Sequence, residues 1–127
     1  MNQELQEHLF KKYPIIFGDR DKSPEESGMN FGLQVGDGWY WLIDMICLQL
    51  QKYHKSVIAF QVKQKFGELR FYVNGATERQ RAIIEFGQML SLSICEKCGS
   101  TDDVLQTNLT GSYIETLCKK CKTLPEK

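Results

Sequence analysis

Four cysteines form two pairs with the same spacing, and they are the residues of this chain best suited to a chemical role. The pairs are Cys95/Cys98 and Cys118/Cys121, and 19 residues separate them. Two residues between thiolates allow a tight backbone turn to place both sulfurs on one edge of a tetrahedron, which the second pair completes. The spacing therefore predicts one Zn²⁺ ion bound by all four cysteines.

A zinc ion with four thiolate ligands has no open coordination position, so we expect it to hold structure and not to activate water. Two alternatives are buried unpaired cysteines and a pair of redox dithiols, but neither explains why both pairs repeat one spacing. Gly99 follows the first pair and favours a turn there. The fifth cysteine, Cys47, lies on the apolar stripe of an expected helix and is interpreted as a buried core residue.

The sequence contains no recognisable catalytic motif. His8 and His54 are isolated and have no metal-ligand spacing, and an HNH-type nuclease would need histidines near the cysteine pairs. The stretch Gly36-Asp37-Gly38 is interpreted as a helix entry capped by Asp37, not as a phosphate loop. Asp37 and Asp44 can share a helix face, but capping and solvent exposure account for both. We therefore expect neither an enzyme nor a small-molecule substrate.

Composition is that of an ordinary globular chain. Its 127 residues are 42% hydrophobic and 25% charged, with zero formal net charge. They suffice for one domain, or for a domain of about 90 residues with an appended module. No apolar run is long enough to span a membrane, and the N-terminal residues lack the apolar segment of a signal peptide. Because metal-binding thiolates suit a reducing compartment, we expect a cytoplasmic protein with no membrane partner.

Local patterns predict the order of helices and strands. Helices are expected over residues 2–12, over residues 39–53, and from the Thr77/Gln80 capping box to Cys95, with Ala82, Ile83, Phe86, Leu90 and Ile94 as the buried side of the last. A short strand is expected over residues 31–35, and two longer ones over 57–64 and 68–73, joined by a turn at Gly67. Residues 18–30 are expected to form a mobile acidic loop.

This order predicts an α+β fold, with a small antiparallel sheet covered by about three helices. Strands expected over residues 104–108 and 113–117, around a turn at 109–112, place a hairpin between the cysteine pairs. The C-terminal part is therefore expected to be a zinc ribbon or a truncated treble clef. We expect a core domain over residues 1–93 and a four-cysteine zinc module over residues 94–127, packed on the core.

Charge is unevenly distributed along the chain. Residues 1–54 carry a balance of −3 and residues 55–81 a balance of +4. Strand alternation would place Lys63, Lys65, Arg70 and Tyr72 on one basic sheet face, a kind of surface that binds single-stranded nucleic acid. An ordinary solvent-exposed sheet face is the alternative. The lysine-rich second cysteine pair adds Lys119 and Lys120 to the candidate surface.

Several motifs together resemble a family of small uncharacterised phage and prophage proteins. They are Lys12-Tyr13-Pro14, Gly36-Asp37-Gly38-Trp39 with Leu42-Ile43, Gln61-Val62-Lys63 with Lys65-Phe66-Gly67-Glu68-Leu69-Arg70-Phe71-Tyr72, and Cys95-Glu96-Lys97-Cys98-Gly99 with Thr116-Leu117-Cys118. The resemblance covers most of the chain and brings no known reaction or site residue. It implies expression inside a bacterial host, where small non-enzymatic phage proteins often redirect host machinery or block defence systems.

The leading hypothesis is a cytoplasmic, non-enzymatic zinc protein that binds a host or phage protein as an adaptor or inhibitor, with anti-defence activity as one form. The segment 18–30 and the aromatic residues 39–41 are candidate contact surfaces. The alternative is a nucleic-acid-binding module that uses the basic sheet face.

Overall fold

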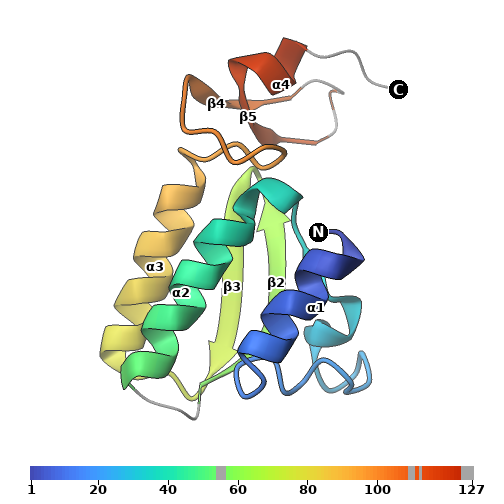
Figure 1. The fold of residues 1–127 in the computed structure, drawn as a ribbon, viewed down its shortest axis with the longest axis vertical. Coiled ribbons are helices and arrows are strands. Elements are labelled where there is room, and N and C mark those ends of the chain that lie inside the picture. Colours follow the sequence, from blue (N-terminus) through green and yellow to red (C-terminus); the bar gives the residue numbers. More distant parts are fainter. Residues whose placement is uncertain (54–56, 109–110, 112, 124–127) are drawn as a thin grey trace.

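The computed structural model describes residues 1–53, 57–108, 111 and 113–123 of the chain. His54 and most of the turn expected at residues 109–112 lie outside the described residues. Figure 1 shows the longer helices beside a small sheet, with a second hairpin and a short helix at one end. The elements are α1 (Gln3–Lys12), η1 (Gly28–Phe31), β1 (Leu33–Gln34), η2 (Asp37–Trp39), α2 (Tyr40–Tyr53), β2 (Ile58–Lys65), β3 (Glu68–Asn74), α3 (Glu78–Ser91), β4 (Val104–Thr107), β5 (Glu115–Cys118) and α4 (Lys119–Thr123), where η marks a 3₁₀ helix.

The expected α+β class is confirmed, and the larger sheet has the strand order β1-β2-β3. The strands β2 and β3 are antiparallel, with Lys63 opposite Arg70. Their turn is tight because Phe66 and Gly67 both adopt positive φ, at 55° and 85°. The short strand β1 differs from the expectation of antiparallel strands, because it pairs with β2 in parallel. Parallel pairing is possible here because α2 lies between the two strands in sequence and carries the chain back.

The side chains of α3 cover the open edge of the sheet. The backbone N–H of Leu69 donates to the Ser91 hydroxyl at 2.9 Å, and that of Phe71 donates to the Gln88 amide oxygen at 2.9 Å. Both donors would otherwise be unpaired at a sheet edge. The capping box expected at Thr77 and Gln80 is present and begins this helix.

The buried side of α3 is only partly the expected one. As expected, Ile94 is buried and Ile83 packs against the core, but Phe86 and Leu90 are exposed. The buried positions of the helix are instead Gln80, Ile84, Gly87 and Ser91. The reason lies in the neighbouring helix. A Cβ on Gly87 would lie 2.5 Å from the Ile46 Cδ1 atom, so this glycine allows α2 and α3 to approach closely. The helix therefore turns a side of small and polar residues inward, where hydrophobic periodicity gives no signal.

Two further expectations need correction. Segment 18–30 is not simply a mobile acidic loop: Met29 is buried, and the Ser27 hydroxyl donates to the Phe60 carbonyl oxygen of β2 at 3.2 Å. Asp37 does not cap the helix that follows it. Its carboxylate instead accepts from the backbone N–H of Asn2 at 2.7 Å, and Asn2 is itself the N-cap of α1. Asp37 therefore links the start of α1 to η2, the short helix that precedes α2.

The C-terminal hairpin pairs β4 with β5 in antiparallel register, and α4 follows directly after Cys118. The first cysteine pair lies in the turn after α3, whereas the second pair spans the end of β5 and the first turn of α4. A turn, a hairpin and a helix start that supply ligands in this order correspond to a short treble clef. This arrangement selects between the two expected alternatives, because a ribbon would place the second pair in another turn.

Candidate metal centre

The four predicted ligands lie together. The sulfur atoms of Cys95, Cys98, Cys118 and Cys121 all lie within 4.8 Å of one another, and the Cys98 and Cys118 sulfurs are 3.6 Å apart. A tetrahedral Zn²⁺ with Zn–S bonds of about 2.3 Å places its sulfurs roughly 3.8 Å apart. The donor set and its spacing therefore fit a single metal ion, as the sequence predicted. Within the described ranges, this is the one cluster of possible metal ligands.

Backbone hydrogen bonds fix the first turn of the site. The N–H of Gly99 donates to the Cys95 carbonyl oxygen at 2.8 Å, and the N–H of Cys95 donates to the Ser100 carbonyl oxygen at 2.8 Å. Gly99 has φ of 82°, a conformation that glycine adopts without strain. The second pair is held by the N–H of Cys121, which donates to the Cys118 sulfur at 3.4 Å. Both turns therefore aim their sulfurs at a common point.

The electrostatics of the four thiols are unequal. Burial opposes ionisation of Cys95, but backbone N–H groups directed at its sulfur outweigh burial and lower its pKa to about 7. Burial and the neighbouring sulfurs raise the pKa of Cys121 to about 12. Cys95 therefore loses its proton more readily than Cys121. Metal binding requires deprotonated sulfurs, so the charge of an incoming divalent ion must displace the remaining protons.

A cluster of four sulfurs and no other donor selects a thiophilic ion. Zinc and iron accept four thiolates in tetrahedral geometry, whereas magnesium and calcium require oxygen ligands. Three of the cysteines are buried and Cys98 is exposed. With all four coordination positions occupied by cysteines, the ion would cross-link the two cysteine pairs and would have no open position for a substrate.

Glu96, between the first two ligands, joins the metal centre to the core. Its carboxylate is buried and accepts from the Gly36 backbone N–H at 3.1 Å and from the Gln64 amide at 3.2 Å. Burial raises its pKa, although these two donors act in the opposite direction. Its own backbone N–H donates to Thr116 of β5 at 2.9 Å. Sequence reasoning missed this residue because a glutamate between two cysteines resembles an ordinary exposed residue.

The metal-binding turn packs against the segment Gly36-Asp37-Gly38. The N–H of Gly38 donates to the Glu96 carbonyl oxygen at 2.7 Å, and a Cβ on Gly38 would lie only 2.2 Å from the Cys95 carbonyl oxygen. Trp39 is fully buried, and its indole N–H donates to the Ile94 carbonyl oxygen at 2.8 Å. The two glycines therefore permit backbone-to-backbone contact, and the tryptophan anchors the chain just before the first ligand.

The predicted basic residues are partly brought together. Lys63 pairs with Arg70, Gln61 with Tyr72 and Lys65 with Glu68 across the β2–β3 ladder. These positions alternate with the buried Val62, Leu69 and Phe71, so they share the sheet face opposite the core. Lys119 and Lys120 lie on a different element, α4, where both are exposed.

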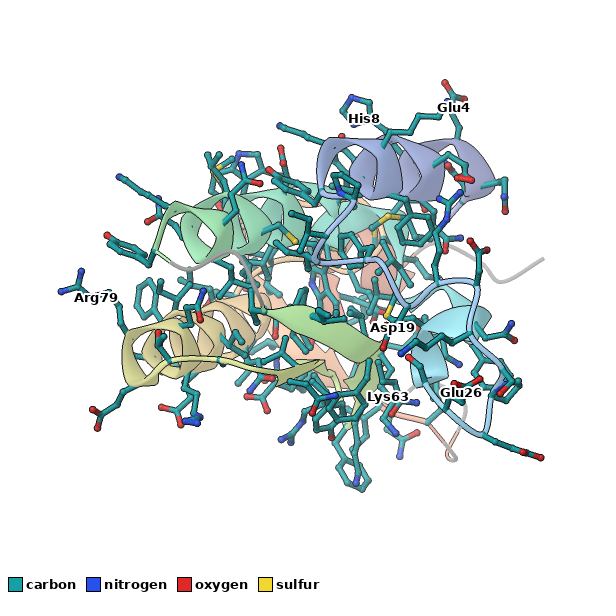
Figure 2. All side chains as sticks on the ribbon, turned by 90° about the horizontal axis from the view of Figure 1, so that it is seen from below. Glu4, His8, Asp19, Glu26, Lys63 and Arg79 are labelled. Carbon is teal, nitrogen blue, oxygen red and sulfur yellow. The ribbon has the colours of Figure 1, made fainter. Side chains whose placement is uncertain are left out.

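The surroundings of Cys47 and His8 favour structural roles for these two side chains. Cys47 is fully buried, and burial raises the pKa of its thiol well above the usual value, which suits a core residue. His8 is exposed on α1 and pairs through Nδ1 with the Tyr40 hydroxyl. Figure 2 shows His8 at the outer side of that helix, away from the sheet.

The helices α2 and α3 present an uncovered apolar surface. Trp41 and Leu48 of α2 are 62% and 40% exposed, and Phe86 and Met89 of α3 are 59% and 58% exposed. Of the aromatic residues expected at 39–41 as a contact surface, Trp39 is therefore excluded by burial and Trp41 is available. We call Trp41, Leu48, Phe86 and Met89 the helical apolar face.

Comparison with family models, with curated proteins and with solved structures found no match to this chain. Among the described residues, no helix is long and apolar enough to cross a membrane.

Proposed function

We propose that this chain is a non-enzymatic zinc protein that binds another protein, as an adaptor or inhibitor of phage origin acting inside a bacterial host cell. Two observations support the proposal. The cysteine cluster has the donor set of a closed structural site, and the chain resembles small phage proteins in several separate motifs. Inhibition of a host defence component is one form that such binding would take.

The helical apolar face carries this proposal. Its residues recur at helical spacing, with Trp41 and Leu48 seven apart on α2 and Phe86 and Met89 three apart on α3. The two helices pack side by side, since the Gln80 amide of α3 donates to the Leu50 carbonyl oxygen of α2 at 2.9 Å. Exposed apolar side chains on two adjacent helices offer a contact surface for the apolar side of a third helix. The partner we propose is therefore an amphipathic helix of a host or phage protein.

Affinity capture of tagged protein from bacterial lysate, with and without nuclease, tests this function by mass spectrometry. We expect one stoichiometric protein that survives nuclease and is lost with the double variant Phe86→Ser/Met89→Ser. The matched control is Lys63→Ala/Lys65→Ala, which changes the opposite side of the molecule and should retain the partner. Absence of any partner above background, or equal capture by the Phe86→Ser/Met89→Ser protein, would contradict the proposal.

The metal is proposed to be zinc, with one ion per chain. Four thiolates with no oxygen or nitrogen donor favour it, as does its structural use in turn–hairpin–helix modules. Metal analysis of protein purified without added metal should give one zinc per chain. Iron or an iron–sulfur cluster in the same position would show a visible absorption band and would overturn the assignment.

A further inference from the structure

In the described part of the chain, one face of the larger sheet is not covered by α1, α2 or α3, although η1 approaches it at Gln61. In Figure 1, α1 and α2 lie on the same side of β2 and β3, and Figure 2 shows Lys63 directed away from that side. The residues on the open side are only partly buried, among them Phe60, Gln61, Lys63, Arg70 and Tyr72. This face therefore presents aromatic and basic side chains together.

An irregularity in β2 builds an aromatic pair on this face. The register shifts between Ala59 and Gln61, so Phe60 and Gln61 both lie opposite Tyr72. Such a bulge redirects a side chain that would otherwise point to the other face. Phe60 and Tyr72 are stacked, with ring centroids 5.7 Å apart and planes inclined by 25°. The sequence alternation predicted Tyr72 on this face but not Phe60.

Cations continue the strip from this pair to the tip of the hairpin. Lys63 lies opposite Arg70, and Lys65 lies with its ammonium group 5.7 Å from the ring centre of Phe66. Phe66 itself is 68% exposed at the turn. Glu68 pairs with Arg70 at 3.0 Å and is the single carboxylate among these positions, which leaves a formal charge of +2.

We infer that this open sheet face binds single-stranded nucleic acid. Phosphates would contact Lys63, Lys65 and Arg70, and unpaired bases would stack on the exposed ring of Phe66 and on the Phe60/Tyr72 pair. The distance from residue 60 to residue 66 along an extended strand is roughly 20 Å, enough for several nucleotides. A duplex is a poor ligand, because its bases are already stacked and are not available to exposed aromatic rings.

The inference is independent of the proposed protein partner, because it uses the opposite side of the molecule. Fluorescence anisotropy of the full zinc-loaded chain with labelled oligo-dT and oligo-U of about 12 nucleotides tests it directly. Three cations that neutralise phosphates predict a salt slope of about −2, so affinity should fall roughly 15-fold between about 50 and 200 mM salt. A 12-base-pair duplex should compete poorly.

Three variants place the binding on this face. Lys63→Ala/Lys65→Ala should reduce the salt slope to about −0.7 and weaken binding about tenfold or more at low salt. Adding Arg70→Ala should abolish binding, and Tyr72→Leu, which keeps an apolar side chain but loses stacking, should weaken it about fivefold. The matched control Lys11→Ala/Lys52→Ala removes two exposed lysines from α1 and α2 and should leave the affinity unchanged.

The outcomes separate this inference from its rivals. Unchanged affinity in Lys63→Ala/Lys65→Ala, equal weakening in Lys11→Ala/Lys52→Ala, or preference for duplex would each overturn it, as would no binding at about 50 mM salt. A Tyr72→Leu protein with full affinity would show charge attraction without stacking, which also contradicts the site. Each variant is compared at equal zinc content and equal thermal midpoint, so that a folding defect is not counted as lost binding.

Discussion

The core and the metal module are stabilised in different ways. Among the residues that the structure describes, twenty buried ones form a single hydrophobic cluster in the core, from Leu9 to Ile94. The buried cluster of the module consists of Leu117 and three of the cysteines, with Val104 packed at its side. Burial of so little apolar surface cannot offset the conformational entropy that is lost when the module folds. We therefore expect the core to fold by hydrophobic burial, and the module to depend on a bound metal.

The largest expected effect is therefore loss of the metal. Structural zinc in small modules contributes on the order of 10–16 kcal/mol of apparent binding free energy, so a strong chelator should unfold residues 95–121 and leave the core folded. Hydrogen exchange resolved by residue measures both parts in one experiment. Fast exchange should appear in β4 and β5 while α2 and β2 remain protected. Equal protection of β4 and β5 before and after chelation would show that the module does not need metal.

Substitution of one ligand separates the metal from the packing of its ligands. Cys98 is the exposed ligand, so Cys98→Ser removes a sulfur with little loss of buried contact. This protein should lose tight zinc binding and reproduce the exchange pattern of the chelated chain. The matched control is Cys47→Ala, which should lower the thermal midpoint of the core but retain one zinc. Full zinc affinity in Cys98→Ser would overturn the four-cysteine assignment.

The next largest effect is expected where the core contacts the metal module, at Gly38. A Cβ on Gly38 would lie 2.2 Å from the Cys95 carbonyl oxygen and 2.6 Å from the Gly99 nitrogen. In Gly38→Ala the metal-binding turn must therefore shift away from residue 38. Overpacking of this kind destabilises by about 1–3 kcal/mol. The protein should keep its zinc but show faster exchange at the Glu96 and Gly38 amides.

Gly18→Ala provides the comparison for Gly38→Ala. The nearest atoms to its added Cβ are backbone oxygens at 3.3 and 3.4 Å, a far milder contact. If Gly38→Ala and Gly18→Ala shift the thermal midpoint equally, the close approach of the two backbones has no special role in attaching the module.

Much of this organisation was predictable from local signals. The cysteine spacing predicted the ligand set, the Thr77/Gln80 pair predicted the start of α3, and alternation predicted Lys63 and Arg70 on one face. These signals are short-range: a turn, a cap and a two-residue period each depend on neighbours in sequence. The resemblance to phage proteins and the function it implies stay predictions.

What sequence reasoning missed depends on contacts between distant segments. The buried side of α3 follows from the fit of Gly87 against Ile46, and hydrophobic periodicity favoured Phe86 instead. Glu96 is buried because Gly36 and Gln64, far away in the chain, supply its donors. The parallel pairing of β1 with β2 likewise joins segments that are far apart in the chain. Polar and small residues in buried positions give no periodic signal, so only the folded arrangement reveals them.

A smaller effect tests whether the two regions are thermodynamically separate. Thr77→Ala removes the hydroxyl that accepts from the Gln80 backbone N–H at 3.2 Å and should destabilise the core by about 1 kcal/mol. Because Thr77 lies at the end of α3 opposite the cysteines, zinc affinity should not change. Denaturant unfolding and zinc competition, done on the same protein, give both numbers. A fall in zinc affinity together with core stability would mean that core and module form one cooperative unit.

The smallest expected effect concerns acid stability of the core. Asp44 accepts from the Tyr13 hydroxyl and pairs with Lys12 at 3.0 Å. Burial opposes its ionisation, but these two partners outweigh burial and hold its pKa below the usual 3.8. A carboxyl whose pKa is lower in the folded chain stabilises that chain above its unfolded pKa, and this contribution is lost as pH falls through the folded pKa.

Asp44→Asn keeps the shape and an acceptor for Tyr13 but removes the charge. It should destabilise the core by about 0.5 kcal/mol near pH 7, the scale of a partly exposed ion pair. The difference from the unchanged protein should shrink below pH 4 and vanish once Asp44 is protonated. Methyl signals of Ile43 and Ile46 report the core alone, so protonation of the cysteines does not enter the comparison. A difference that stays constant down to the lowest pH would assign the effect to packing and would show that the charge of Asp44 does not stabilise the core.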